Sequence, residues 1–202
     1  PLPSDQGGLP HGGHDVLDAR VIGNLVFMAA RTGDTQIYSA SDILTGETLI
    51  GPEPFGVILA DDLRVGEDDG VMAQMARVYE KFRCSVIAIE EVPMDEIDKY
   101  GVIAGSQIEE GLFMVSDMVE KPGPEEAPSN LAIIGRYILT PDIFDIIRST
   151  PPGKNGEIQI TDALRTQAQR NMVVAYKFKG KRFDCGSVEG FVAATNYFYS
   201  LT

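Results

Sequence analysis

Residues 55–62 read Phe55-Gly56-Val57-Ile58-Leu59-Ala60-Asp61-Asp62. An unbroken run of apolar residues and glycine, closed abruptly by two acids, is the pattern of a central strand that is buried on both faces. A half-exposed strand would instead alternate apolar and polar residues. The stretch therefore predicts a buried sheet strand that ends at Asp61.

A helix and a second strand are expected directly after this strand. Apolar residues recur at helical spacing over 71–82, with Asp68 or Asp69 placed as N-cap. The apolar run at residues 85–89 predicts the next strand. Strand, helix and strand in this order predict a right-handed crossover between parallel strands.

The alternation of strands and helices continues to the end of the chain. Further strands are expected at 100–104, 112–115, 131–139 and 172–178, and further helices at 141–149, 161–170 and after Gly186-Ser187. This succession predicts one α/β domain over residues 1–202, with a mostly parallel, twisted sheet and helices on both faces in a Rossmann-like arrangement. Residues 20–54 do not follow the alternation, because Gly33, Gly46 and Gly51 divide them into short pieces. We expect an insertion there, either a β-hairpin or a partly ordered segment.

Composition and charge restrict the classes of function. Of the 202 residues, 44% are hydrophobic, enough for one sizeable core, and no apolar run approaches the length of a membrane span. The formal charge of -13 repels nucleic-acid backbones, although a cation in a cleft would still allow a small phosphorylated ligand. The first residues lack the features of a signal peptide. We expect a cytoplasmic protein without nucleic-acid or membrane partners.

Asp61 and Asp62 are the first candidates for chemistry. Open α/β sheets bind ligands at the carboxyl ends of their strands, where these two acids lie. Carboxylate oxygens suit Mg²⁺, which takes one or two protein carboxylates together with substrate phosphates. The alternative is that the two acids only end the strand and cap a turn.

Three later clusters of polar residues extend the candidate site. Glu120 and Lys121 follow a strand-like segment and could bind sugar hydroxyls and a phosphate, respectively. Asn130 precedes a strand and could exchange hydrogen bonds with hydroxyls. Asp184 lies two residues before Gly186, which permits close approach of the backbone. Each cluster also has a structural alternative: a polar loop, a turn and a residue near a helix start.

These residues lie, in order, within long strings that resemble the UTP–glucose-1-phosphate uridylyltransferase family. The strings are Val119-Glu120-Lys121-Pro122, Pro128-Ser129-Asn130-Leu131-Ala132-Ile133-Ile134-Gly135-Arg136-Tyr137, Thr150-Pro151-Pro152-Gly153, Gly156-Glu157-Ile158-Gln159-Ile160-Thr161-Asp162-Ala163 and Lys179-Gly180-Lys181-Arg182-Phe183-Asp184-Cys185-Gly186. Asp61 and Tyr100-Gly101-Val102 precede them in the matching order. The resemblance covers residues 53–200 and implies the nucleotide-diphospho-sugar transferase fold.

The N-terminal stretch resembles the family only in part. Gln6-Gly7 and Gly13-His14 are similar to the family's Gln-Gly…Gly-Leu-Gly-His-Ala-Val loop, which approaches uracil, whereas His11, Gly12 and Asp15 depart from it. The glycine-rich Gly-x-Gly-Thr-Arg loop that opens the family's fold has no counterpart in this sequence. The resemblance therefore implies a partial nucleotidyltransferase domain without its first βα unit, either part of a longer enzyme or a naturally short homologue.

The resemblance implies formation of UDP-glucose and pyrophosphate from UTP and glucose 1-phosphate by Mg²⁺-dependent in-line displacement. By position in the motifs, Asp61 and Asp184 would bind the metal, and Asp61 and Lys121 would be the catalytic residues. The substrate-binding residues would be Gln6, Gly13, Gly101, Glu120 and Asn130.

Two other functions are compatible with the same residues. A metal-dependent glycosyltransferase that uses a UDP-sugar would also place acids after a central strand. A non-catalytic or impaired homologue would bind a sugar nucleotide without turnover. Because a sheet without its first unit exposes an edge and apolar surface, we also expect a homo-oligomer.

Overall fold

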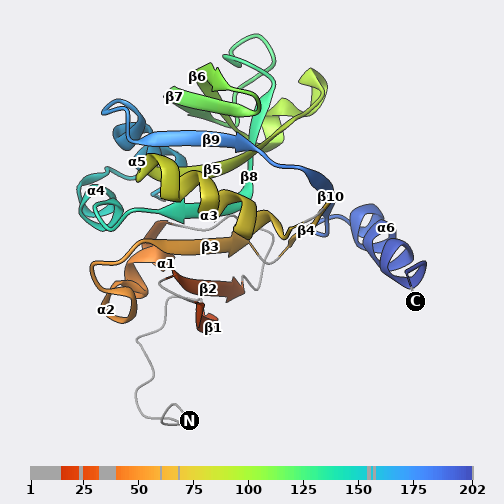
Figure 1. Cartoon of the computed structure of the whole chain (residues 1–202). Helices are drawn as coiled ribbons and strands as arrows, with labels where there is room; N and C mark the ends of the chain where they lie inside the picture. Colours follow the sequence, from red (N-terminus) through yellow and green to blue (C-terminus); the bar gives the residue numbers. More distant parts are fainter. Residues whose placement is uncertain are drawn as a thin grey trace.

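The fold of the protein, taken from a computed structural model, is built on one eight-stranded sheet (Figure 1). The structure describes residues 15–22, 25–31, 40–59, 61–67, 69–153, 156 and 158–201. Along the sheet the strands follow the order β1-β2-β3-β8-β5-β9-β7-β6. They span β1 (Asp15–Ile22), β2 (Leu25–Arg31), β3 (Phe55–Leu59), β5 (Ser85–Glu91), β6 (Gly101–Glu109), β7 (Leu112–Glu120), β8 (Leu131–Leu139) and β9 (Val173–Lys177).

Helices and a separate two-stranded ribbon complete the fold. The helices are α1 (Ala40–Thr45), α2 (Glu47–Ile50), α3 (Val71–Phe82), the 3₁₀ turn η1 (Met94–Lys99), α4 (Ile143–Ser149), α5 (Ile160–Ala168) and α6 (Val188–Tyr199). The ribbon pairs β4 (Asp62–Gly66) with β10 (Gly180–Asp184) in antiparallel register. None of the helices in the described ranges is long and apolar enough to cross a membrane.

The sheet is mixed, which corrects the expectation of a mostly parallel one. By their pairings β2, β3, β5, β6 and β9 run in one direction, and β1, β7 and β8 run in the other. Most strands thus share a direction, but only β2–β3 and β5–β9 are parallel neighbours. The reason is that β8 inserts antiparallel between β3 and β5, so the crossover through α3 passes over it.

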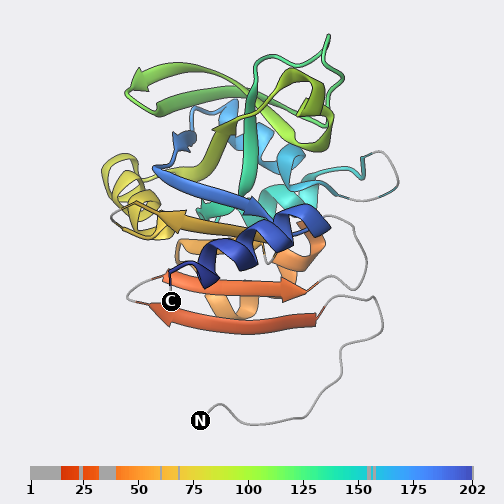
Figure 2. The ribbon, with the colours of Figure 1, turned by 90° about the vertical axis from the view of Figure 1, so that its right-hand side faces the viewer.

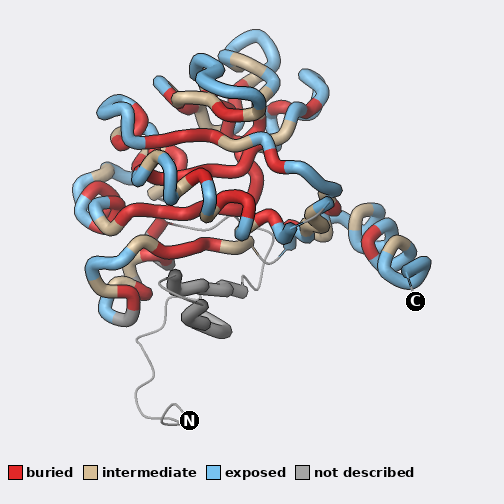
Figure 3. The backbone as a smooth tube through the Cα atoms, in the orientation of Figure 1, coloured by how far each residue is buried: buried red, intermediate tan, exposed pale blue. Residues whose placement is uncertain are grey.

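Helices cover both faces of the sheet, as the sequence predicts. Along β5, Ile87 and Ile89 pack in the core with α1, α2, α4 and α5, whereas Val86 and Ala88 pack in the core under α3. Successive side chains on a strand point to opposite faces, so one continuous apolar run serves both layers. Figure 3 shows the central strands buried and α6 largely exposed at the side of the molecule.

The N-terminal segment is part of the sheet and core. The segment expected as an insertion, residues 20–54, contains the end of β1 and the whole of β2; β1 and β2 pair antiparallel, and β2 pairs in parallel with β3. Ala40, Ile43 and Ile50 of the helices that follow are buried in the main core. Figure 2 shows β1 and β2 at one end of the sheet and β6 and β7 at the other.

Two details of the expected helices differ in the structure. The N-cap of α3 is Gly70, without a side-chain hydrogen bond, so Asp69 is not the cap; Asp68 lies outside the described residues. Helix α4 begins at Ile143 rather than at Pro141, because the two preceding residues form a turn. By contrast, α6 begins as expected after Ser187, whose side chain accepts a hydrogen bond from the Gly190 amide.

Candidate active site

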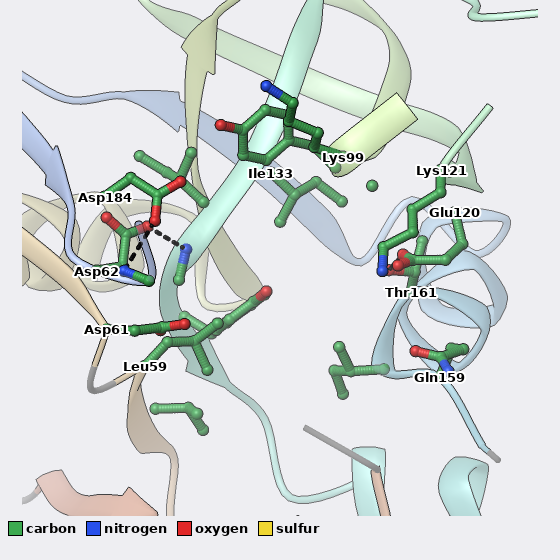
Figure 4. Close-up of a pocket in the computed structure, with 18 of the residues that line it drawn as sticks. Leu59, Asp61, Asp62, Lys99, Glu120, Lys121, Ile133, Gln159, Thr161 and Asp184 are labelled. Carbon is green, nitrogen blue, oxygen red and sulfur yellow. Dashed lines mark hydrogen bonds between the residues drawn. The ribbon is translucent and has the colours of Figure 1, made fainter. Parts of the chain in front are cut away.

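A cavity of about 300 Å³ opens between the end of β3, the end of β7 and the start of α5. Ile133, Ile134 and Gly135 of β8 also line it. Figure 4 shows Asp61, Asp62 and Asp184 on one side, and Glu120, Lys121, Thr161 and Gln159 on the other. Residues far apart in the sequence therefore meet around one hollow.

The acidic side brings together Asp61 and Asp184. The backbone amide of Cys185 donates a 2.7 Å hydrogen bond to the Asp61 carbonyl, which ties the end of β10 to the end of β3. Asp61 Oδ2 and Asp184 Oδ1 lie 3.4 and 3.2 Å from the position that a Cβ on Gly186 would take. Gly186 therefore lies between the two carboxylates, and its lack of a side chain leaves the space between them open.

Asp61 has a raised pKa. Burial is the largest cause, and the negative charges of Asp62 and Asp184 raise the pKa further, whereas a hydrogen bond to its own backbone and the charge of Arg182 lower it. Crowded carboxylates of this kind are stabilised by a bound cation, which lowers the pKa of nearby acids.

Asp62 differs from Asp61, although the two are adjacent. Its side chain is buried, and Oδ2 accepts hydrogen bonds from Arg64 and from the Gly135 amide at 3.2 Å. Oδ1 accepts from Arg182 Nε at 3.2 Å. Both acids line the cavity, but the sequence alternative, a structural role at the strand end, describes Asp62, because only its carboxylate is held by buried arginines.

We expect Asp62→Asn to destabilise the protein by about 3–5 kcal/mol, because buried guanidinium groups lose their counter-charge. The Arg64 side chain is only 2% exposed, and burial lowers the pKa of Arg64 to about 10 even with Asp62 present. Urea unfolding would measure the loss. Asp145→Asn is the control, because Asp145 pairs with Arg148 while 89% exposed and should change stability little. A loss for Asp62→Asn no larger than that of the control would contradict the prediction.

The opposite side is organised around Glu120. The buried Thr161 hydroxyl donates a 2.6 Å hydrogen bond to Glu120 Oε2. A Cβ on Gly101 would lie 3.1 Å from the same oxygen and 3.0 Å from the Thr161 hydroxyl. A side chain at position 101 would require the carboxylate and its donor to shift by a few tenths of an ångström, so Gly101, Glu120 and Thr161 are tightly packed together.

Lys121 adopts a backbone conformation that places it beside Glu120 rather than opposite to it. Adjacent strand residues point to opposite faces, but Lys121 follows the last residue of β7 and has φ of 47°. Its amide donates a 3.0 Å hydrogen bond to the Tyr100 carbonyl. The left-handed turn explains how both Glu120 and Lys121 line the same cavity.

Thr161→Val is expected to weaken binding of a hydroxylated ligand at Glu120 by about 10-fold, because a hydrogen bond to a charged group contributes about 1.5–3 kcal/mol. Thr166→Val is the matched control on the same helix, since the Thr166 hydroxyl donates only to a backbone carbonyl, at 3.4 Å. Isothermal titration with UDP-glucose would compare the two variants. Equal affinities would show that Thr161 does not hold Glu120 for binding.

The structure brings together most of the predicted site residues. Asp61, Asp184, Gly101, Glu120 and Lys121 all line the cavity. Asn130 is exposed and is not among the lining residues; its carbonyl accepts a hydrogen bond from the Val92 amide. Because Asn130 precedes β8, it lies beyond the part of that strand that borders the cavity. Gln6 and Gly13 lie outside the described residues.

Sequence reasoning assigned no role to Thr161, Arg182 or Tyr100, which also line the cavity. All three lie within or beside the strings that carry the family resemblance. No local pattern marked Arg182, because residues 180–184 read Gly-Lys-Arg-Phe-Asp and contain one large apolar residue, too few to predict a strand. It was missed because its partner β4 is more than a hundred residues earlier.

The donor set of the cavity fits a magnesium ion that is shared with phosphates. Within the described ranges no three His, Cys, Asp or Glu side chains are grouped so that they could hold a metal ion. Asp61 and Asp184 supply two carboxylates, and Mg²⁺ is commonly bound by one or two carboxylates plus water and substrate phosphates. The residues present therefore suit this ion rather than a metal that needs a complete protein cage.

Comparison with known proteins identifies the family. The family model described as Nucleotidyl transferase matches residues 25–200. The chain belongs to the nucleotidyl transferase family. A UTP–glucose-1-phosphate uridylyltransferase of Pseudomonas aeruginosa PAO1 is 67% identical over 158 residues, which make up 78% of this chain and 57% of the relative. A putative member with the same name from Methanocaldococcus jannaschii is 43% identical over 75% of this chain and 53% of the relative.

Solved structures of this family confirm the fold. The structure of a UDP-glucose pyrophosphorylase complexed with UDP-glucose aligns with a TM-score of 0.76 and 63% identity, covering 79% of this chain and 61% of that chain. An apo UDP-glucose pyrophosphorylase aligns with a TM-score of 0.78 and 60% identity, over 82% and 62% of the two chains. The resemblance found in the sequence, including the nucleotide-diphospho-sugar transferase fold, is thus confirmed. The chain spans a little over half the length of the relatives that it matches.

Proposed function

We propose that the protein forms UDP-glucose and pyrophosphate from UTP and glucose 1-phosphate. The observation that carries the proposal is the pairing, across one cavity, of the Asp61–Asp184 side with the Glu120–Lys121 side. The first side suits a cation and phosphates, and the second suits a sugar phosphate. The relatives named above, at 67% and 43% identity, bear the name of this activity.

In this reaction the protein mainly positions its substrates and neutralises charge. The phosphate oxygen of glucose 1-phosphate attacks the α-phosphorus of UTP while pyrophosphate leaves in line, and a sugar phosphate is already anionic near neutral pH. Glu120, held by Thr161, accepts hydrogen bonds from sugar hydroxyls, and Gly101 lets the backbone approach the ring. Lys121 neutralises the sugar phosphate.

Magnesium is the cation that we propose for the acidic side, held by Asp61 and Asp184. When bound, Mg²⁺ would neutralise the phosphate oxygens and orient the nucleotide. Asp62 is left out of this binding because its side chain is only 7% exposed and is ion-paired with Arg64 and Arg182, whereas the Asp184 side chain is 48% exposed.

Pyrophosphate release tests the proposal directly. The purified protein, given UTP, glucose 1-phosphate and Mg²⁺, should release pyrophosphate and form UDP-glucose, and EDTA should stop both. Binding of UDP-glucose without turnover would support the non-catalytic homologue instead. Transfer of glucose from UDP-glucose to an acceptor, with no pyrophosphate formed, would support a glycosyltransferase.

We also propose that the protein is a homo-oligomer. Helix α6 and the residues just after it leave six large apolar side chains exposed: Val188, Phe191, Val192, Phe198, Tyr199 and Leu201. An exposed apolar set of this size is typical of a contact surface. Sedimentation velocity should show a species larger than one chain, and a monodisperse monomer would contradict the proposal. The cytoplasmic location stays a prediction.

A further inference from the structure

Arg182 touches residues of both sides of the cavity, and no role was assigned to it above. We propose that Arg182 is a positioning residue that holds Asp184 on the acidic side and Tyr100, with Lys121 behind it, on the sugar side. The proposal rests on the proposed function, since it assigns the metal and the sugar phosphate to these sides. Arg182 acts through its neighbours and is not proposed to touch the reacting atoms.

On the acidic side, Arg182 is shared between three carboxylates. Its Nε donates to Asp62 Oδ1 at 3.2 Å, and Nη2 lies 3.5 Å from Asp184 Oδ2. Nη1 lies 3.6 Å from Glu90 Oε2. The side chains of Arg182 and Asp62 are 13% and 7% exposed, so their ion pair is little screened by solvent, whereas the Asp184 side chain is 48% exposed on its open side. Asp62 is fixed in the core, and Arg182 therefore transmits that fixed position to Asp184, the proposed metal ligand.

On the sugar side, Arg182 holds Tyr100 in two ways. Nη1 donates a 3.1 Å hydrogen bond to the Tyr100 hydroxyl, and the guanidinium carbon lies 4.9 Å from the centre of the ring. The Tyr100 carbonyl in turn accepts the amide of Lys121 at 3.0 Å, and the next residue is Gly101. Fixing Tyr100 thus fixes the backbone around both Lys121 and Gly101.

These contacts require arginine rather than any cation. A guanidinium has a planar face for the ring and several fixed donors for separate acceptors, whereas an ammonium is a point charge on a flexible stem. Arg64 provides a comparison within the same ribbon, because it lies opposite Arg182 in the β4–β10 register. Arg64 also pairs with Asp62 but is not among the residues that line the cavity.

The test compares Arg182→Gln and Arg182→Lys with Arg64→Lys and with Tyr100→Phe in the purified protein. Mn²⁺ binding in the presence of UDP-glucose would be measured by electron paramagnetic resonance. The KM for glucose 1-phosphate and kcat would be measured separately. Changing a residue that orients a metal ligand typically costs about 10- to 100-fold in affinity. We therefore expect Arg182→Gln to weaken Mn²⁺ binding by about 10-fold or more and to raise this KM by a similar factor.

The other variants separate positioning from stability. Tyr100→Phe should raise the KM for glucose 1-phosphate and leave Mn²⁺ affinity unchanged, because it removes only the contact on the sugar side. Combined with Arg182→Gln it should add little, since both changes break the same contact. Arg182→Lys should recover Mn²⁺ affinity in part but not the KM. Arg64→Lys should lower the melting temperature without changing the Mn²⁺ affinity or the KM for glucose 1-phosphate.

Three results would overturn the proposal. The first is that Arg182→Gln changes the Mn²⁺ affinity and the KM for glucose 1-phosphate by less than about twofold, and the second is that Arg64→Lys changes them by the same factors as Arg182→Gln. The third is that the effects of Arg182→Gln and Tyr100→Phe on this KM multiply independently. Failure of the proposed function is a different result. In that case the unaltered protein itself would neither bind UDP-glucose nor release pyrophosphate.

Discussion

Asp61→Asn is expected to lower kcat for UDP-glucose formation by about 10²- to 10⁴-fold, because metal stabilisation of phosphate charge contributes several kcal/mol. The variant keeps the shape of the side chain and removes the charge that binds the cation. Among the described side chains, no arginine forms an ion pair with Asp61 that would be broken, in contrast to Asp62. We therefore expect the melting temperature to change by no more than a few degrees.

The decisive comparison for Asp61 is with the residue next to it. Asp62→Asn should mainly lower the free energy of unfolding, whereas Asp61→Asn should lower turnover and Mn²⁺ affinity at nearly unchanged stability. Asp69→Asn is a control for the removal of one acid on the surface, because Asp69 pairs with Arg77 where both side chains are more than half exposed. If Asp61→Asn kept more than about a tenth of the activity, the assignment of the cation to this carboxylate would be wrong.

Lys121→Met is expected to lower kcat/KM for glucose 1-phosphate by about 10²- to 10³-fold, the range measured when one group that stabilises an oxyanion is removed. Methionine keeps much of the length of the side chain and removes the ammonium that would face the sugar phosphate. Lysine and methionine are destabilised equally by the left-handed backbone conformation at position 121, so the free energy of unfolding should be preserved. Steady-state kinetics with glucose 1-phosphate as the varied substrate would measure the effect.

Lys81→Met is the matched control for Lys121. Lys81 lies on α3, pairs with Glu109 at the surface and is about half exposed. Its loss should leave kcat/KM unchanged, because it is not among the residues that line the cavity. Equal kinetics for the two variants would remove Lys121 from the site.

Local sequence patterns were sufficient to predict the central elements. The strand at 131–139 and the helix at 71–82 have the predicted bounds, because continuous apolar runs and helical spacing report burial directly. The mixed sheet was not predictable in this way. An apolar run is equally suited to parallel and antiparallel neighbours, and nothing local indicates that β8 would insert between β3 and β5.

The site shows the same division. Local sequence was enough to show that acids end a buried strand at Asp61 and that Glu120, Lys121 and Asp184 lie in strings typical of one enzyme family. It could not show that Asp62 is held in the core by arginines while Asp61 faces the cavity, or that Asn130 lies outside the lining. The first outcome depends on the β4–β10 ribbon, which brings Arg182 to Asp62 across more than a hundred positions of sequence. Neither outcome follows from local sequence, because pairing between distant segments sets which partners these side chains meet.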